Sequence, residues 1–500
     1  MHKKILTLSA LPILLAFIGG CGGSGHHTTP PPAEVPVVVS VSDQPPTGIN
    51  VVSFQLTITG GCLLTAAEAG ATSCTGAQNL FPVAPDTIQF ANLQTPVESD
   101  VVSSTNVQAG TYTGVLLMFG TGTATVTVDP GQVFGDGTTT CDNSAGTTPL
   151  VCQLAPAVSS STVTANFSAP VTLTSGTPVQ IAIDLNVGSS LVNTTGTLSI
   201  NPAATVTENS TVGTDGNLVD VSQVTGTVTA VTATSVTITD SATGQPVTLN
   251  VGTSTVINNF PTSATCTTAN TFACVQTGNV VTVGFGANGT TSLSFNATSI
   301  NGNPGFNSTT AFEATIVQTT PAVEAVITAV PSGNTDSLTV GQVVTLDATG
   351  ATFSTSSSNT LPGQFLTSAD FVVGQNVLID ASAFTAAAPP TLAIATADAV
   401  ELLPTQINGM ADNLAAPNLT IDGLNTFFTG NGVTAVNAQT GSFTTFDGTV
   451  HQFSDMTAGE SLSFNGFLEN NPATPGTPVF LTTNVFGAQA TAAAAKTTKR

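Results

Sequence analysis

The sequence predicts an all-β protein, with an N-terminal antiparallel β-sandwich followed by two or three small β-barrel-like repeats. Apolar and polar residues alternate with a period of two in many segments, as they do in strands that rest one face on a core. Thr, Val, Ile and Phe dominate these segments, and Gly, Asn, Asp and Pro separate them at intervals of roughly a dozen residues. Beyond the N-terminal apolar segment, no stretch keeps the 3.6-residue period of a helix.

Two segments illustrate the alternation. Within Ile49–Thr59, the residues expected on the buried face are Val52, Phe54, Leu56 and Ile58. Within Val179–Val187, they are Val179, Ile181, Ile183, Leu185 and Val187. Polar residues lie between them, so each segment is expected to be a half-buried antiparallel strand.

The chain has 500 residues, which is more than one hydrophobic core usually holds, so we expect several domains. The predicted divisions are a signal peptide (1–20), a flexible tether (21–34), a β-sandwich domain (35–208), three barrel repeats (220–316, 317–403 and 404–486) and a disordered tail (487–500).

The N-terminus has the three parts of an export signal. His2, Lys3 and Lys4 form a basic segment, and the apolar run 5–18 is too short to span a membrane comfortably. Ile18-Gly19-Gly20-Cys21 resembles a lipobox, which implies cleavage before Cys21 and lipidation of that cysteine. The alternative is an ordinary signal peptide with an incidental cysteine. Residue 22 is Gly rather than Asp, which by resemblance to lipoprotein sorting in Gram-negative bacteria favours the outer membrane.

Six of the seven cysteines remain once Cys21 carries lipid, and they form three neighbouring pairs. The pairs are Cys62 with Cys74, Cys141 with Cys152, and Cys266 with Cys274. In an oxidising compartment this spacing favours three local disulfides, although six cysteines allow other connectivities. Each bond would contribute about 2–3 kcal/mol through loop closure. Zinc is the alternative, but no C-x-x-C spacing occurs, so we predict no metal site there.

Cations are confined to the two ends of the chain. The five are Lys3, Lys4, Lys496, Lys499 and Arg500, and removal of the signal peptide with Lys3 and Lys4 changes the formal charge from −23 to −25. Nucleic-acid binding and adhesion to anionic lipid both require Lys or Arg, so neither partner is expected. We expect contact with the membrane only through the lipid anchor, and this composition leaves open a cation, a neutral polymer or a protein at the cell surface as a partner.

The first domain resembles a known family. The blocks that carry the resemblance are Val39–Pro46 (VSVSDQPP), Ile49–Thr59 (INVVSFQLTIT), Ile88–Leu93 (IQFANL), Val107–Phe119 (VQAGTYTGVLLMF) and Ile181–Val192 (IAIDLNVGSSLV). They resemble domain-of-unknown-function family 4382, a β-sandwich-like domain of bacterial lipoproteins whose function is not established. Members usually carry an Arg in the strand after the Gly-x-Tyr turn, and this sequence has Val115–Met118 there.

Beyond residue 220 a degenerate repeat occurs. A turn glycine is followed by apolar residues three and five positions later, and an apolar residue stands three positions before it. The three sets are Gly278 with Val275, Val281 and Val283; Gly374 with Phe371, Val377 and Ile379; and Gly459 with Met456, Leu462 and Phe464. The opening segments Val224–Val231 and Ser235–Asp240 resemble domain-of-unknown-function family 5666, a small β-barrel. The alternative is chance recurrence in a Thr-rich β protein.

Sites of known chemistry are weakly indicated. Gly284–Gly289 matches G-x-G-x-x-G, but a strand rather than a helix is expected to follow, so we predict a hairpin and no dinucleotide cofactor. His451 is the only histidine beyond the tether, and it lacks a G-x-S-x-G partner motif. Asp215-Gly216-Asn217 with Asp220 either forms a turn or binds Ca²⁺.

These observations predict a non-enzymatic cell-envelope lipoprotein with a structural or adhesive role, and no cofactor. The alternative is a glycan- or peptide-binding surface module, and the third hypothesis is a carboxylate-dependent hydrolase. Convergent Asp, Glu and Phe in one concave pocket would favour binding, whereas two facing carboxylates in a cleft would favour hydrolysis.

The anchor is testable by metabolic labelling. Cells that express the full chain should incorporate radiolabelled palmitate into it, because the acyl chains attach to the Cys21 thiol. Cys21→Ser should abolish labelling and membrane retention, whereas Ser24→Ala in the tether should retain both. Labelling that survives Cys21→Ser would exclude the lipobox.

Overall fold

The computed structural model describes residues 33–44, 50–81, 86–90, 100–211, 217–241, 244–262, 266–289, 293–331, 334–357, 359–387, 392–448, 450–474 and 476–487. Within these ranges nearly all of the regular secondary structure is strand, as predicted. The predicted signal peptide and Cys21 lie outside the described residues, as do nearly all of the predicted tether and tail.

The N-terminal domain is a β-sandwich, as predicted. One sheet has the strand order β15-β12-β1-β5, and the other has the order β11-β6-β2-β3 with β4 and β9 on its long strands. A small sheet of β10, β14, β7, β8 and β13 lies at one end. The elements are β1 (Glu34–Gln44), β2 (Asn50–Leu64), η1 (Ala66–Glu68), β3 (Gln78–Asn79), β4 (Asp86–Gln89), β5 (Asp100–Gln108), β6 (Gly110–Val128), β7 (Val133–Gly135), β8 (Thr140–Asp142), β9 (Leu150–Leu154), β10 (Ala157–Val158), β11 (Thr162–Leu173), β12 (Val179–Asn186), α1 (Val187–Ser190), β13 (Leu191–Thr194), β14 (Thr197–Ile200) and β15 (Ala204–Asn209).

The alternation predicted for two strands of this domain is nearly complete. All five expected residues of Val179–Val187 are buried, as are Phe54, Leu56 and Ile58 of β2. Val52 is the exception, because the register of β2 against β6 shifts between Val51 and Ser53. Val52 therefore packs against the core of the third barrel instead of the sandwich core. The pairing of β1 with β12 is parallel, whereas the neighbouring pairs in that sheet are antiparallel.

Three closed barrels follow within the described residues. The first comprises β16 (Val219–Val231), β17 (Ser235–Asp240), β18 (Pro246–Asn250), β19 (Val256–Asn258), η2 (Phe272–Cys274), β20 (Asn279–Asn288) and β21 (Ser294–Asn307). The second comprises β22 (Ala311–Gln318), β23 (Glu324–Ala329), β24 (Val343–Asp347), β25 (Thr352–Thr355), η3 (Ser368–Asp370), β26 (Asn376–Thr385) and β27 (Ala393–Leu403). The third comprises β28 (Thr405–Ala415), β29 (Asn418–Asp422), α2 (Thr426–Thr429), β30 (Val436–Gln439), β31 (Thr445–Gly448), η4 (Phe453–Asp455), β32 (Glu460–Glu469) and β33 (Val479–Gly487).

All three barrels have one topology. In the first, the order β18-β17-β16-β20-β21 closes through a parallel bridge between β18 and β21, and the short strand β19 pairs with the outer side of β21. The other two barrels repeat this arrangement strand for strand. Counted along the main strands, the order is 1-2-3-5-4-1, which is that of the Greek-key barrel called the OB-fold.

The predicted boundary between the first two repeats at residues 316 and 317 is wrong. Strand β22 begins at Ala311 and pairs with β23 and β26 of the second barrel, so the barrel begins six residues before the predicted start. The polar turn Asn307–Thr310 separates β21 from β22, so the boundary between the two barrels coincides with a turn signal in the sequence.

The predicted repeat glycines occupy one structural position. Gly278, Gly374 and Gly459 all have positive φ, at 91°, 93° and 82°, and each precedes the fourth main strand of its barrel. Their N–H groups donate to the first strand, to the carbonyls of Val228, Ile316 and Ala411, each at 2.8 Å. The apolar residues predicted around these glycines are buried. The repeat is therefore real and has three copies.

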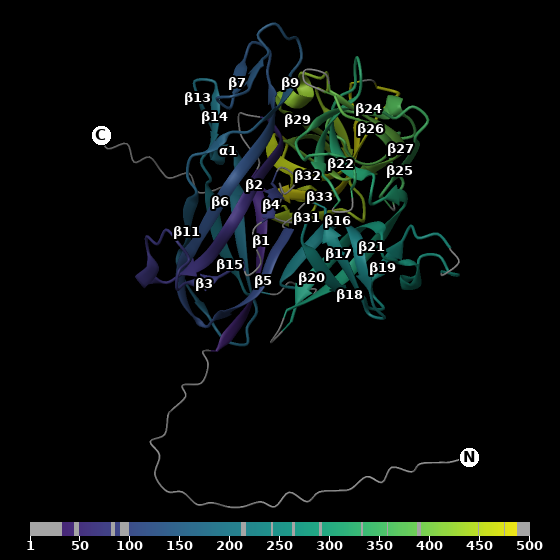
Figure 1. Ribbon diagram of the computed structural model, residues 1–500. Helices are drawn as coiled ribbons and strands as arrows, with labels where there is room; N and C mark the ends of the chain where they lie inside the picture. Colours follow the sequence, from purple (N-terminus) through teal and green to yellow (C-terminus); the bar gives the residue numbers. More distant parts are fainter. Residues whose placement is uncertain are drawn as a thin grey trace, which may run out of the picture.

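The barrels pack against one another and against the sandwich. In Figure 1 the third barrel (yellow) lies between the first domain (blue) and the second barrel (green). Its core includes Val317 and Val326 of the second barrel, and Val52 and Val151 of the first domain pack against it. Thr125 of the sandwich donates to the Gly341 carbonyl of the second barrel at 2.6 Å. The four units thus share buried surfaces.

The cysteines lie at disulfide distance in the three predicted pairs. The Cα–Cα separations are 5.7 Å for Cys62 and Cys74, 6.2 Å for Cys141 and Cys152, and 4.9 Å for Cys266 and Cys274. Two of the bonds lie in the first domain and one in the first barrel, so none crosses a domain boundary.

A glycine substitution tests the junction between the second and third barrels. A Cβ on Gly374 would lie 2.5 Å from the Phe428 ring of α2, whereas a Cβ on the equivalent Gly278 has no neighbour within 4 Å. Both alanine variants pay the cost of positive φ, but Gly374→Ala also overpacks the junction. Chemical denaturation should show Gly374→Ala less stable than Gly278→Ala by about 1–3 kcal/mol. Equal losses would mean that the two barrels do not pack here.

Candidate functional site

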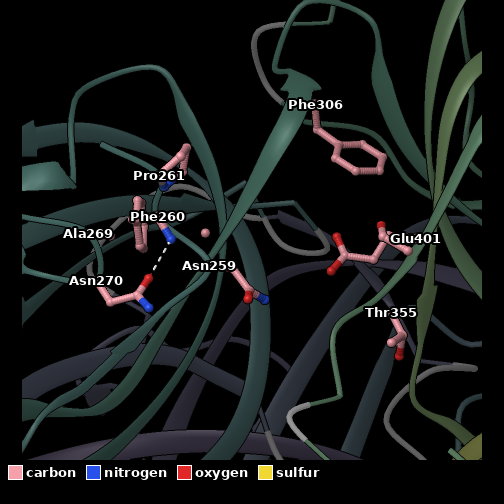
Figure 2. A pocket seen from close by; sticks show the side chains of 10 residues that line it. Asn259, Phe260, Pro261, Ala269, Asn270, Phe306, Thr355 and Glu401 are labelled. Atoms are coloured by element: carbon pink, nitrogen blue, oxygen red, sulfur yellow. Dashed lines mark hydrogen bonds between the residues drawn. The ribbon is translucent and has the colours of Figure 1, made fainter. Parts of the chain in front are cut away.

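A cavity of about 420 Å³ lies between the first and second barrels. This volume is within the range of small-molecule sites. Its lining residues come from loop and strand segments of the two barrels: Asn259, Phe260, Pro261, Ala269, Asn270, Gly302, Phe306, Ser354, Thr355 and Glu401. In Figure 2, Phe260 and Asn270 of the first barrel lie on one side and Glu401 and Thr355 of the second barrel on the other, with Phe306 of β21 drawn above Glu401.

The wall from the first barrel is a loop of fixed shape. Asn259 and Asn270 both adopt positive φ, at 58° and 56°. The Phe260 N–H donates to Oδ1 of Asn270 at 2.9 Å, and the Asn270 N–H donates to the Phe260 carbonyl at 3.0 Å. The Cys266–Cys274 pair closes the same loop. The Phe260 ring packs on Gly302 of β21, where a Cβ would lie 2.9 Å from the ring.

The wall from the second barrel carries a buried acid. Ser354 on β25 stands beside Glu401 on β27 in the parallel register. The Glu401 side chain is only 3% exposed, and its carboxyl group points across the cavity toward the first barrel (Figure 2). With its amide nitrogen turned toward the Gly302 carbonyl, Asn303 donates to Oε2 of Glu401 at 3.3 Å.

The charge state of Glu401 depends on the solution pH. Burial raises the pKa of its carboxyl group to about 8. The sequence holds no Lys or Arg between residues 5 and 495, so no such side chain of the fold can pair with it. At neutral pH most molecules therefore carry a protonated Glu401, whose carboxyl group is a hydrogen-bond donor at the cavity.

Two further acids lie at junctions between barrels. Burial raises the pKa of Glu313 on β22 to about 7, and Asp240 of the first barrel adds to this effect while a hydrogen bond from Thr225 opposes it. At the junction of the second and third barrels, Glu469 is fully buried. Burial raises its pKa to about 8, against a hydrogen bond from the Gly363 N–H, and its Oε1 has no hydrogen-bond partner.

The cavity favours binding over acid–base catalysis. Glu401 is the one carboxyl group among its lining residues, and a glycosidase-type mechanism needs a pair. In the described part of the chain, no three His, Cys, Asp or Glu residues come together as metal ligands. Polar groups, two phenylalanine rings and one acid converge instead.

The residues singled out from the sequence lie elsewhere, apart from Cys266 and Cys274, which close the lining loop. His451 is exposed and precedes η4, and its backbone N–H donates to the Asp455 carboxylate at 3.0 Å. Gly284 and Gly286 lie in β20, which leads into the expected hairpin with β21. Asp215 lies outside the described residues, and so does the side chain of Asp220, so the Ca²⁺ reading of this segment stays untested.

Sequence reasoning missed Glu401. Ala399–Leu403 is Ala-Val-Glu-Leu-Leu, an acid inside a buried apolar run. An acid buried in such a run is paired, holds a proton or lines an internal space, so the run is a signal for a site at Glu401.

Comparisons with known proteins name no relative. A comparison with models of protein families found no match, and a comparison with curated proteins found none. The resemblances to families 4382 and 5666 therefore stay predictions. No helix in the described ranges is long and apolar enough to cross a membrane.

The buried acids predict stability that falls as pH rises. A carboxyl group with a raised folded pKa gives its full stability below its ordinary pKa near 4.5 and loses it as the pH rises through the folded value of about 8. The melting temperature should therefore be higher at pH 5 than at pH 8.5. At pH 8.5, Glu401→Gln and Glu469→Gln should each raise the free energy of unfolding by about a few kcal/mol, and with it the melting temperature. At pH 5, both substitutions should change these two quantities little.

The control is Glu460→Gln, because Glu460 lies on the same strand as Glu469 but at its exposed end. It should leave the pH profile unchanged. A flat profile in the wild-type protein would mean that the junction acids are solvated.

Proposed function

We propose that this chain is a lipid-anchored cell-envelope protein of the outer membrane, with a structural or adhesive role rather than an enzymatic one. The lipobox at Cys21, the Gly and Pro tether after it and the paired cysteines support export and anchoring. The absence of Lys and Arg between residues 5 and 495 supports contact through neutral β surfaces instead of charge.

The packing of the four units carries the structural part of this proposal. At the junction of the second and third barrels, Gln364 and Asn470 form a two-way backbone bridge, at 3.0 and 3.2 Å. Nearby, Gln375 donates to the Leu468 carbonyl at 3.0 Å, and Phe467 of the third barrel lies in the core of the second. Units joined in this way behave as one body rather than as beads on a linker. Such a body suits a spacer or an adhesive surface.

A second candidate is a binding module for a glycan or a peptide. The observation that favours it is the cavity at Glu401, with Phe260 and Phe306 in its lining. This candidate is compatible with the first, since an anchored body can also carry a ligand site.

Adhesion is testable in a flow cell. Cells that express the full chain should be retained on hydrated polymer surfaces more than cells that express Cys21→Ser, whose protein is not anchored. Because the fold offers no cations, retention should not fall when NaCl is raised from about 0.05 to 0.5 M, where charge attraction is screened. Retention that drops severalfold with salt, or that is equal in the two strains, would contradict an anchored adhesive role.

A further inference from the structure

We propose that the cavity between the first and second barrels binds an organic ammonium ion, either a free amine or a lysine side chain, which pairs with Glu401 and packs on Phe260 and Phe306. This inference does not depend on the anchor or on the adhesive role.

The barrel fold itself does not require an acid at this position. In each barrel the short outer strand pairs with the fifth main strand, so equivalent positions can be counted from the first residue pair. The third residue pair is Asn258 with Asn301 in the first barrel, Ser354 with Glu401 in the second, and Asp447 with Phe486 in the third. The antiparallel partners agree, because Ile300, Val400 and Val485 pair with Val283, Ile379 and Phe464, each five residues after a repeat glycine. The equivalent positions therefore hold Asn301, Glu401 and Phe486. An amide and an aromatic ring serve the other two barrels.

The acid is costly where it lies. A buried carboxyl group without a cation either takes up a proton or is stabilised by hydrogen bonds. The hydrogen-bond donor to Glu401 is the neutral amide of Asn303, at 3.3 Å. An entering cation supplies the missing charge. An anionic ligand would meet this acid with no Lys or Arg of the fold to balance it.

The aromatic side chains narrow the ligand class. Phe260 and Phe306 both line the cavity, and a ring face attracts an ammonium group while its carbon atoms fill apolar space. A metal ion fits less well, because Ca²⁺ takes six to eight oxygen ligands and only one carboxyl group is present. The formal charge of −23 also draws cations toward the protein from a distance.

Titration calorimetry on the purified full chain, kept in detergent, tests the proposal. The probe is n-butylammonium, and n-butanol is its uncharged counterpart. The amine should bind and the alcohol should bind at least tenfold more weakly. Affinity for the amine should rise roughly tenfold per pH unit between pH 6 and pH 8, as Glu401 loses its proton, and then level off. Acetyl-Gly-Lys-Gly-amide carries the same ammonium group on a lysine side chain. If it binds as tightly as the amine, the cavity accepts a lysine side chain, and if the amine alone binds, the ligand is a free amine.

Matched variants connect the binding to this cavity. Glu401→Gln removes the charge, keeps the shape and relieves burial of an acid, so it should fold and should bind the amine at least tenfold more weakly. Glu324→Gln, on strand β23 of the same barrel, should bind as the wild-type protein does. Phe260→Leu should weaken binding by about two- to fivefold through the lost ring face.

Three outcomes would overturn the proposal. One is equal affinity for the amine and the alcohol, which indicates an apolar cavity only. Another is amine binding that survives Glu401→Gln, which indicates general attraction to an acidic surface. The third is the absence of binding by both the amine and the lysine peptide, or Ca²⁺ binding that Glu401→Gln abolishes in their place.

Discussion

The fold depends on how its carboxyl groups are stabilised without Lys or Arg partners. No Lys or Arg lies between residues 5 and 495, so each carboxyl group is solvated, accepts hydrogen bonds or holds a proton. Asp136 takes the second route: burial tends to raise its pKa, but N–H groups of Ala155, Thr139 and Thr138 and the Thr138 hydroxyl outweigh burial and lower it. Asp370 is similar, with donors from Asn470, Leu366 and Thr367. Turn acids of this kind stabilise the loops above their pKa values.

The acids that hold a proton lie where barrels meet. Glu313 and Glu401 face the junction of the first and second barrels, and Glu469 faces that of the second and third. Their pKa values of about 7 to 8 mean that ionisation at mildly alkaline pH charges the junctions rather than the barrel cores. The individual barrels keep apolar interiors, so the contacts between units are the pH-sensitive part of the molecule. The interiors of the barrels are thus held by apolar packing, whereas the junctions between barrels also depend on the protonation of these acids.

Local patterns predicted local structure well. Alternation identified the strands, the glycines at 278, 374 and 459 identified three copies of one barrel, and neighbouring cysteines identified the pairs that lie together. The errors came from contacts between units. Val52 follows the alternation, yet a register shift turns it toward the third barrel, and β22 pairs with strands of the second barrel although the predicted boundary places most of it in the first. The cavity was missed for the same reason: it joins residues about 140 positions apart, such as Asn259 and Glu401, and no sequence period links them.

Repetition of the barrel explains how one junction could acquire a ligand site. The β19–β21 edge of the first barrel and the β25–β27 edge of the second are equivalent pieces of structure, and both line the cavity. At the next junction, Phe467 of β32 enters the neighbouring core and the Gln364–Asn470 bridge adds backbone hydrogen bonds, so different elements form that contact. The first and second barrels share their own apolar cluster, which includes Phe306 and Ala399, so their junction is packed beside the cavity. The barrel fold does not require an acid at the position of Glu401, and either a bound proton or a cationic ligand offsets the burial of its charge.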